Sequence, residues 1–429
     1  MPYQECKDIN KCKACPITVV NKNEGAVPIS QDTGDVWFCT NCFYCEDVCS
    51  DYSPRQYAVD QRRSCDQKSA RMIEPIREIK KYGFLFDLTK SVKDIRESYG
   101  LPLLPPSDLA TFNYLIDNVM EKKVKENQKI SFNTNPLFNR EEKDEIALFL
   151  GCLIPYRVPN YELSARRLLN KLEVKYRDLP FVCCGSIMTE SQSEELWLVI
   201  VAYNLAIAEK YGFRKIISLC GGCSGNLRRG NQILLDDKSK LEYVNKYLSK
   251  ISMIYSGKII VEHLSEFLLS NSMQSKIDCL KNQDQTQNLN LLQVATQVPC
   301  QVIRPSKYSP SAKLGSDLLR NLLEKTSIII IKYPFETFCC GSSMLIYDEK
   351  IALDIAKKRI DSLIKHKVDA LIMGCGNCSM NYTVHQREYS DIHLPTFFFS
   401  EILDYALGTS YPDIDEIIDR KRIKVQSKL

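Results

Sequence analysis

The sequence predicts an α/β protein in which a largely helical N-terminal domain precedes a duplicated module built on parallel sheets. Three observations lead to this prediction. From about residue 146 onward, short continuous apolar segments alternate with amphipathic helical segments, as in parallel sheets covered on both faces. A pattern of cysteines occurs twice in that part of the chain. Before it, cysteines are concentrated in the first 65 residues, and helical patterns follow them.

Composition limits the classes of function that the chain can have. The net charge of +4 on 429 residues does not suggest nucleic-acid binding. The start of the chain lacks a basic and then apolar signal region, and no apolar segment is long enough to span a bilayer. We therefore expect a cytoplasmic protein, or one held peripherally on the inner face of the membrane by a partner. In that compartment, 19 cysteines indicate metal binding rather than structural disulfides.

The N-terminal cysteines predict a ferredoxin-like 4Fe–4S domain over residues 1–95. The segment "CTNCFYCEDVC" has the spacing C-x2-C-x2-C-x3-C, which is typical of a 4Fe–4S cluster. Zinc also uses C-x2-C pairs, but the third cysteine at the same short interval favours iron–sulfur. The predicted metal ligands in this segment are Cys39, Cys42, Cys45 and Cys49.

Four further N-terminal cysteines have less regular spacing. They are enough for a second four-cysteine cluster, and Cys15-Pro16 resembles the end of a ferredoxin motif. The alternative is a single cluster together with a zinc site or some free thiols. The candidate cofactor-binding residues of this group are Cys6, Cys12, Cys15 and Cys65.

The rest of the chain divides into four segments. Residues 96–145 are expected to be a helical linker region, in which Ser107 is a plausible helix N-cap. The two copies of the module occupy residues 146–275 and 290–408, and the polar sequence "KNQDQTQNLN" between them resembles a linker. Residues 409–429 are expected to form an exposed C-terminal tail.

Each copy of the module contains a lone cysteine, an adjacent pair and a C-x2-C pair. Every one of these cysteines falls at the carboxyl end of a predicted strand, where ligands gather in open α/β sheets. Gly185 and Gly341 follow the pairs and supply the bend that would bring both neighbouring thiols to one pocket. The first set is Cys152, Cys183, Cys184, Cys220 and Cys223, and the second is Cys300, Cys339, Cys340, Cys375 and Cys378.

An iron–sulfur cluster in each copy explains these sets best. A vicinal disulfide would explain only the adjacent pairs, and inert buried cysteines would not repeat in register. Zinc uses four ligands and leaves a fifth thiol over, so zinc in one copy remains the lesser alternative. Cys279 belongs to neither set and is interpreted as an incidental thiol.

The two sets resemble the cysteine-rich CCG domain of the heterodisulfide reductase B-type subunit. The segment around "CTNCFYCEDVC" resembles the C-type subunit, and one chain carrying both resembles the fused D-type subunit. This resemblance implies two non-cubane 4Fe–4S clusters, held by the ten catalytic cysteines, that reduce or form a disulfide between thiol cofactors. One or two N-terminal cubanes would supply the electrons.

A second branch of similar proteins leaves another function open. Related cysteine-rich chains are electron-transfer subunits of flavin-dependent glycolate, lactate or glycerol-3-phosphate dehydrogenases. The sequence has no recognisable flavin or nicotinamide domain, so electrons are expected to pass to or from a partner. The resemblance implies a flavoprotein or another iron–sulfur protein as that partner, and a membrane-bound quinone or cytochrome as a further one. His263 is interpreted as structural or pocket-lining rather than as a ligand.

Overall fold

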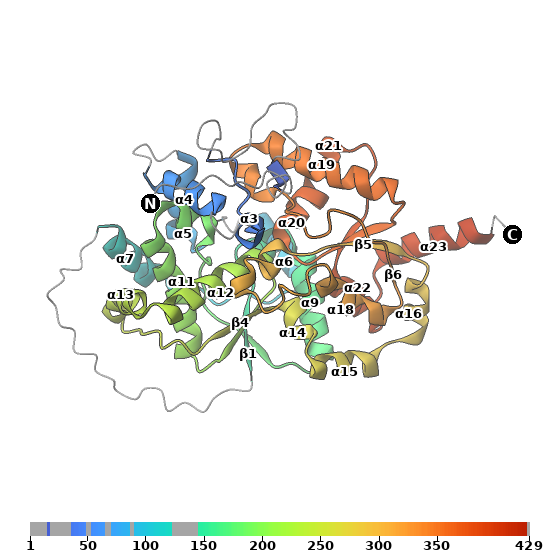
Figure 1. Cartoon of the computed structure of the whole chain (residues 1–429). Coiled ribbons are helices and arrows are strands. Elements are labelled where there is room, and N and C mark those ends of the chain that lie inside the picture. The colour runs from blue at the N-terminus through green and yellow to red at the C-terminus, as the bar shows by residue number, and fades with distance from the viewer. Residues whose placement is uncertain are drawn as a thin grey trace. The chain divides into compact units, whose positions relative to one another are not determined.

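The computed structural model describes residues 15–17, 36–48, 53–64, 70–85, 90–121 and 145–426 (Figure 1). The predictions for Cys6, Cys12, Cys49 and Cys65 fall outside these residues. The chain forms two compact units, each assembled from segments distant in the sequence. Unit 1 comprises Met1–Ala58, Asn160–Glu173 and Leu264–Leu429, and unit 2 comprises Val59–Pro159 and Val174–His263. The division of the chain into the five consecutive segments that the sequence predicts remains a proposal.

Unit 2 is built on a parallel four-stranded sheet in the order β2-β1-β3-β4. β1 is buried along its whole length, as its continuous apolar sequence predicts. The strands are β1 (Ile146–Phe149), β2 (Tyr176–Asp178), β3 (Lys215–Ser218) and β4 (Ile260–His263).

Helices surround this sheet, and the longest of them is buried almost throughout. That helix, α11 (Glu194–Lys210), is capped by Ser193, whose hydroxyl accepts a hydrogen bond from the amide of Leu196 at 3.1 Å. The other helices are α5 (Ala70–Tyr82), α6 (Lys90–Ser98), α7 (Leu109–Met120), α8 (Ile154–Arg157), α10 (Ser186–Gln192), α12 (Gly221–Asp236), α13 (Lys238–Leu248) and the 3-10 turn η1 (Ser249–Ile251).

The prediction of Ser107 as an N-cap was wrong by one residue. Asp108 caps α7, because its carboxylate accepts a hydrogen bond from the amide of Thr111 at 3.0 Å. The hydroxyl of Ser107 instead donates to the carbonyl of Phe181 at 2.6 Å. Ser107 therefore fastens the segment before α7 to the loop that carries the first cysteine pair.

Unit 1 repeats the same sheet topology, in the order β6-β5-β7-β8 and again parallel throughout. The duplicated parallel-sheet module predicted from the sequence is therefore confirmed, whereas the ferredoxin-like N-terminal domain remains a prediction. The strands are β5 (Gln293–Gln297), β6 (Ile329–Ile330), β7 (Ala370–Met373) and β8 (Thr396–Phe398).

The helices of unit 1 come from all three of its segments, and α4 (Pro54–Ser64) runs from unit 1 into unit 2. The helices are α3 (Tyr44–Val48), α9 (Pro159–Lys171), α14 (Leu264–Leu268), α15 (Asn271–Leu280), α16 (Gln283–Leu289), α17 (Cys300–Ile303), α18 (Asp317–Leu323), α19 (Glu349–Lys365), α20 (Gly376–Ser379), α21 (Gln386–Tyr389), α22 (Phe399–Ala406), α23 (Pro412–Gln426) and the short turns η2 (Ser306–Tyr308), η3 (Glu324–Thr326), η4 (Ser342–Ile346) and η5 (Met380–Val384).

The polar sequence expected to be a linker contains a helix. Asn282 caps α16 by accepting a hydrogen bond from the amide of Gln285 at 3.2 Å, and Leu289 is buried. The segment is thus tied to unit 1 rather than being an extended connection. Within the described ranges, no helix combines the length and the apolar character that crossing a bilayer requires.

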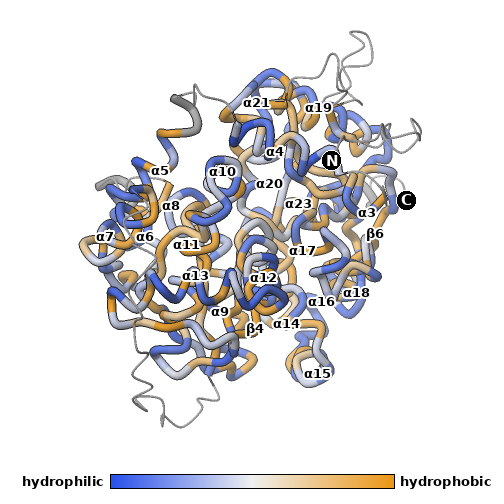
Figure 2. Tube along the Cα trace, turned by 60° about the vertical axis from the view of Figure 1, so that its left-hand side comes forward, coloured by the Kyte–Doolittle hydropathy of each residue, from blue (hydrophilic) through white to orange (hydrophobic). Residues whose placement is uncertain are grey.

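Helix α9 packs inside unit 1, although it belongs in sequence to the first copy of the module. The Tyr161 ring stacks on Phe398, with ring centroids 4.0 Å apart, and the hydroxyls of Ser164 and Ser400 lie 2.7 Å apart. These contacts join α9, the second helix after β1, to the end of β8 and the start of α22. Figure 2 shows hydrophobic and hydrophilic residues alternating along such helices.

Candidate metal centres

The first cysteine set gathers at the carboxyl edge of the sheet in unit 2. Cys152 follows β1, the adjacent pair lies between β2 and α10, and the C-x2-C pair begins α12 after β3. All five cysteines are buried. Their thiols form a continuous chain of hydrogen-bonding neighbours in the order Cys152, Cys183, Cys184, Cys223 and Cys220. The structure thus brings together the five side chains that the pattern predicts to converge.

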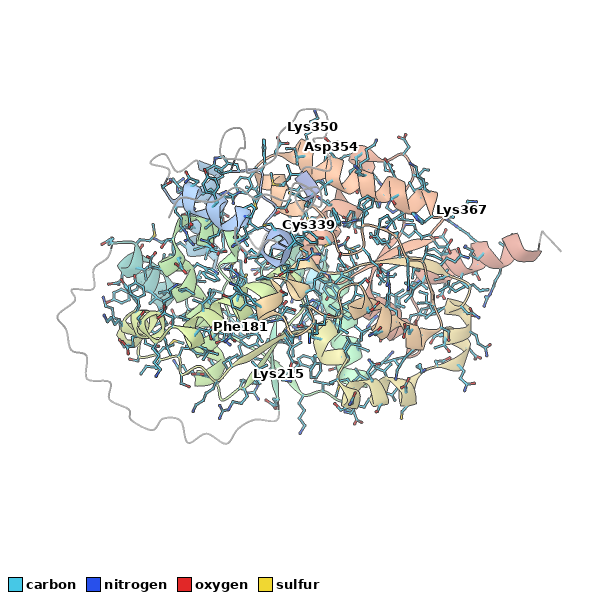
Figure 3. The ribbon with its side chains drawn as sticks, viewed as in Figure 1. Phe181, Lys215, Cys339, Lys350, Asp354 and Lys367 are labelled. Atoms are coloured by element: carbon cyan, nitrogen blue, oxygen red, sulfur yellow. The ribbon has the colours of Figure 1, made fainter. Side chains whose placement is uncertain are left out.

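The second set repeats this arrangement within unit 1. Cys300 begins α17 after β5, the adjacent pair precedes η4, and the C-x2-C pair lies at the start of α20 after β7. Cys300 is half-buried and the other four are buried. The neighbouring thiols follow the matching order Cys300, Cys339, Cys340, Cys378 and Cys375. In Figure 3, Cys339 lies below α19, whose exposed side carries Lys350 and Asp354.

A glycine in the left-handed region follows each cysteine pair. Gly185 has φ 87° and Gly341 has φ 82°, which is a backbone conformation that other residues rarely adopt. A Cβ at Gly185 would lie 3.3 Å from Ile200, and one at Gly341 would lie 3.0 Å from Ile355. The glycines therefore provide both the bend expected from the sequence and a close approach to the next long helix.

A buried asparagine holds each cysteine turn in place. Asn226 Nδ2 donates to the carbonyl of Cys184 at 2.5 Å, and Asn381 Nδ2 donates to the carbonyl of Cys340 at 2.8 Å. Sequence reasoning assigned these residues no role. The signal was present, because "CGGCSGN" and "CGNCSMN" share an asparagine three residues after the last cysteine.

The thiols of each set act strongly on one another's pKa. Hydrogen bonds with Cys152 and Cys184 raise the pKa of Cys183, and those with Cys184 and Cys220 raise the pKa of Cys223. Cys184 shows the opposite effect, since its hydrogen bonds with Cys183 and Cys223 lower its pKa.

The second set shows the same alternation. The pKa is raised at Cys339 by hydrogen bonds with Cys300 and Cys340, and it is lowered at Cys340 by those with Cys339 and Cys378. Backbone amides also face this pair, with Gly341 N 3.4 Å from the sulfur of Cys339. In both sets, the pKa of the first cysteine of the pair is raised and that of the second is lowered.

This donor set fits an iron–sulfur cluster. Five sulfurs in one continuous chain of neighbours exceed the four ligands of a structural zinc site, and soft thiolates are the ligands that iron–sulfur clusters use. Gly151 leaves room for a sulfur atom, because a Cβ at this position would lie only 2.7 Å from the sulfur of Cys223. A side chain larger than that of glycine at residue 151 would therefore collide with a sulfur of the first set.

Three cysteines of the N-terminal motif also lie close together. Burial is the main cause that raises the pKa of Cys45, and the charges of Cys39 and Cys42 raise it further. Asn41 has φ 52° and Phe43 has φ 60°, so the backbone between the cysteines is tightly wound. Cys49, the fourth member of the motif, lies outside the described residues.

This N-terminal segment packs against the second cysteine set. Burial raises the pKa of Cys42, and the charge of Cys300 contributes to the same shift. Thr40 O accepts a hydrogen bond from Ser343 Oγ at 2.8 Å. Gln301 Nε2 donates to the carbonyl of Asn41 at 3.3 Å. Within unit 1, the N-terminal thiols and those of the second set are therefore neighbours.

Two further contacts fasten the N-terminal residues to the same part of unit 1. Arg304 lies with its guanidinium 4.4 Å from the ring centroid of Tyr44 and donates to the carbonyl of Thr337 at 2.9 Å. Ile17 belongs to an apolar cluster with Met344 and residues of α19, against which Cys15 packs. Of the second candidate cluster, Cys15 is the one cysteine in the described ranges.

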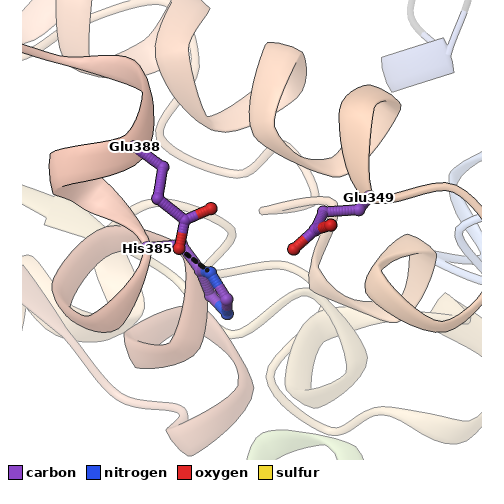
Figure 4. A group of neighbouring side chains, drawn as sticks. All are labelled: Glu349, His385 and Glu388. Atoms are coloured by element: carbon purple, nitrogen blue, oxygen red, sulfur yellow. Dashed lines mark hydrogen bonds and ion pairs between the residues drawn. The ribbon is translucent and has the colours of Figure 1, made fainter.

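Histidines contribute little to these sites. His263 is buried, and its Nε2 lies 3.1 Å from the carbonyl oxygen of Leu219, as befits a structural residue. His385 Nδ1 lies 2.7 Å from Glu388, and Glu349 faces this pair (Figure 4). Both glutamates are exposed, so a solvated hydrogen-bonded pair accounts for this group.

Comparisons with known proteins agree with this geometry. The CCG cysteine-rich domain family matches residues 146–228 and 294–382. The B-type subunit of a ferredoxin:CoB-CoM heterodisulfide reductase from Methanosarcina mazei is 28% identical over 63% of this chain and 91% of its own length. The D-type subunit of the dihydromethanophenazine:CoB–CoM heterodisulfide reductase from the same organism is 22% identical over 56% of this chain and 54% of its own length.

A solved structure shares the fold. A hypothetical protein from Helicobacter pylori matches 81% of this chain and 74% of its own, with a TM-score of 0.50 and 17% identity. The chain thus contains two CCG cysteine-rich domains, each presenting five adjacent thiols at the edge of a parallel sheet, and it is similar to B- and D-type heterodisulfide reductase subunits, which supports an iron–sulfur redox subunit.

Proposed function

We propose that the chain reduces, or in the reverse direction forms, a disulfide between two thiol cofactors at two non-cubane 4Fe–4S clusters. The single observation that supports this proposal most is the pair of matched five-thiol sets. The first cluster would be held by Cys152, Cys183, Cys184, Cys220 and Cys223, and the second by Cys300, Cys339, Cys340, Cys375 and Cys378.

The chemistry explains why two sets are needed. Cleaving one S–S bond takes two electrons and two protons and yields two thiols, whereas a 4Fe–4S cluster supplies one electron at a time. The chain's own residues would hold the thiolates: the glycine bends place both cysteines of each pair, and Asn226 and Asn381 fix the turns. A redox partner, either a flavoprotein or another iron–sulfur protein, would supply the electrons.

The N-terminal cysteines would carry those electrons inward. Cys39, Cys42, Cys45 and Cys49 would hold a cubane that supplies one-electron transfer toward the second set, since the charge of Cys300 acts on Cys42. Cys6, Cys12, Cys15 and Cys65 would hold a second cubane. The relatives named as CoB-CoM heterodisulfide reductase subunits make that disulfide the first substrate to test.

An EPR experiment tests the proposal. The anaerobically purified and oxidised full chain would be examined with no thiol, with coenzyme M, with coenzyme B and with a non-cofactor thiol. We expect a new iron–sulfur signal with one of the cofactor thiols, and its loss in Cys184→Ser or Cys340→Ser but not in Cys279→Ser, since Cys279 is exposed and outside both sets. If the EPR signals of the clusters do not change with any of the thiols, the result would instead favour an electron-transfer subunit of a flavin-dependent dehydrogenase.

A further inference from the structure

A buried arginine lies directly behind the second cysteine set. Arg359 on α19 is only 2% exposed. Its guanidinium donates to the carbonyl oxygens of Phe338 and Cys339, at 2.9 and 3.3 Å, and also to Gln297 and Tyr382. Arg359 therefore fastens the backbone of the cysteine pair and places a positive charge beneath it.

This charge has no carboxylate partner among the described residues. All four groups that accept from Arg359 are neutral, and its Nε has no hydrogen-bond partner. The buried carboxylate of Glu336 is engaged by Arg320 instead. The groups whose charge would act on Arg359 are Tyr382 and Tyr333 first, and then Cys340 and Cys378. Burial raises the pKa of both tyrosines, which keeps them neutral. Because an unpaired buried charge is costly, thiolates that hold a cluster at the second set would balance that of Arg359.

The first repeat performs the same positioning without a charge. Asn204 stands as far beyond Ser193, the N-cap of α11, as Arg359 stands beyond Asp348, the N-cap of α19. Asn204 Nδ2 donates to the carbonyl of Cys183 at 3.1 Å, and its Oδ1 accepts from the amide of Val182 at 3.0 Å. A neutral amide therefore suffices to hold a cysteine turn, and the arginine of the second repeat adds something beyond positioning.

The first repeat does contain a buried arginine, but that arginine is neutralised. Arg229 forms a two-bond ion pair with Glu190, at 2.7 and 2.6 Å, and both side chains are almost fully buried. A neutral amide thus contacts the cysteine turn of the first set, and Arg229 of the same repeat is paired, whereas Arg359 contacts the turn of the second set without a carboxylate partner among the described residues.

We propose that Arg359 makes the two centres electrochemically unequal, by raising the reduction potential of the cluster in the second set above that of the first. This inference rests on the proposed function, because it requires a cluster in each set. Reduction adds one negative charge to a cluster, and a nearby buried cation stabilises that charge in a low dielectric. An electron delivered by the redox partner would therefore settle on the second centre before the first.

A redox titration of the full chain, followed by EPR, tests this inference. In the parent protein, we expect two reductive transitions assigned to the two sets. Arg359→Asn, which gives the second repeat the residue of the first, should move the higher transition to a more negative potential and leave the other in place. Arg359→Lys, which keeps the charge, should restore most of the shift. Lys350→Gln, which removes an exposed charge on the same helix, should move neither transition.

The outcomes separate the inference from the proposed function. Parent protein that binds no iron at the two sets would refute the proposed function itself. Two clusters whose transitions are unmoved by Arg359→Asn, or shift together by the same amount, would overturn the role of Arg359 alone. Loss of iron from the second set in both Arg359→Asn and Arg359→Lys would also overturn it, because a structural role is not rescued by charge.

Discussion

The two cysteine sites share one frame, which is the bent cysteine pair with the asparagine that bonds to it. They differ in the residues that surround this frame. In both, a left-handed glycine bends the cysteine pair and a buried asparagine bonds to its second carbonyl. The charged groups near the frame are different, since Arg359 has no carboxylate partner in the described residues whereas Arg229 is paired with Glu190. The duplication has kept what positions the sulfurs and changed what sets their electrostatic environment.

The neighbours of the two sites differ as well. The second site adjoins the cysteine-bearing N-terminal segment, through Thr40 and Asn41. Near the first site, in unit 2, α4 contacts helix α10 after the cysteine pair: Arg63 Nε donates to the carbonyl of Glu190 at 2.9 Å. The two sets of thiols therefore have different segments of the chain beside them.

Removing one central thiol from either set should give the largest effect. We expect Cys184→Ser and Cys340→Ser each to lose the iron of one set only, because the substituted thiol links its two neighbours in the sulfur chain. Loss of a residue that merely orients a metal ligand typically reduces metal affinity or activity about 10–100-fold, so loss of a ligand should lower disulfide reduction by at least about 100-fold.

The measurements for this comparison are iron and acid-labile sulfide content, together with the rate of disulfide reduction. Cys279→Ser is the matched control and should leave both unchanged, since Cys279 is exposed. Retention of full iron content in either central variant would contradict the assignment of that set as a cluster site.

Breaking the ion pair between Glu190 and Arg229 in the first repeat should give the next largest effect. Glu190→Gln leaves Arg229 buried without its anion, which we expect to cost about 3–5 kcal/mol of unfolding free energy. The double variant Glu190→Gln with Arg229→Met should recover much of that loss. Denaturant unfolding of all three proteins measures this. Equal stability of the single and double variants would show that the pair is not compensated as described.

The sequence predicted the repeated frame because repetition itself is a signal. Ten cysteines in matching order, with glycines after the pairs, were sufficient to predict two five-thiol sites on parallel sheets. The same reasoning could not find Asn204, Arg359 or the pair of Glu190 with Arg229. These residues differ between the repeats, so nothing in the pattern marks them.

Assembly of the units was also beyond the sequence pattern. Residues 160–173 belong to unit 1, although they follow the first strand of the first repeat. Helix periodicity shows that α9 has an apolar face, but it does not show which element covers that face. The stack of Tyr161 on Phe398 is a long-range contact, and no local spacing predicts it.

A pH effect should distinguish α22 from its counterpart in the first repeat. Burial raises the pKa of Glu401 to about 7, although its carboxylate accepts hydrogen bonds from the amide of Phe398 and from Asn160. The folded state therefore keeps a proton that the unfolded chain loses above its ordinary pKa of 4.5. The stability that this carboxyl contributes is fully present below about pH 4.5, and it is lost as the pH rises through about 7.

Glu401→Gln should therefore remove part of this pH dependence and stabilise unit 1 above pH 7 by about 1–3 kcal/mol, since one pKa unit corresponds to about 1.4 kcal/mol. Thermal unfolding between pH 5 and pH 8 measures the difference. Glu266→Gln, at the corresponding place after β4, is the control and should leave the slope between these pH values largely unchanged. A parent protein that is equally stable across this range would contradict the effect.

Two glycines near the strand ends offer the finest distinction between the repeats. A Cβ at Gly151 would lie 2.7 Å from the sulfur of Cys223, whereas one at Gly374, near the end of β7 in the second repeat, would lie 3.0 Å from Pro299. Both Gly151→Ala and Gly374→Ala should cost about 1–3 kcal/mol through overpacking. Only Gly151→Ala should also reduce the iron content of a cysteine set, because only there does the added methyl group displace a sulfur.

Gly100→Ala, with a similar positive φ but open space around it, controls for backbone strain at Gly151. Iron loss in Gly374→Ala equal to that in Gly151→Ala would mean that general destabilisation, rather than sulfur displacement, empties the sites.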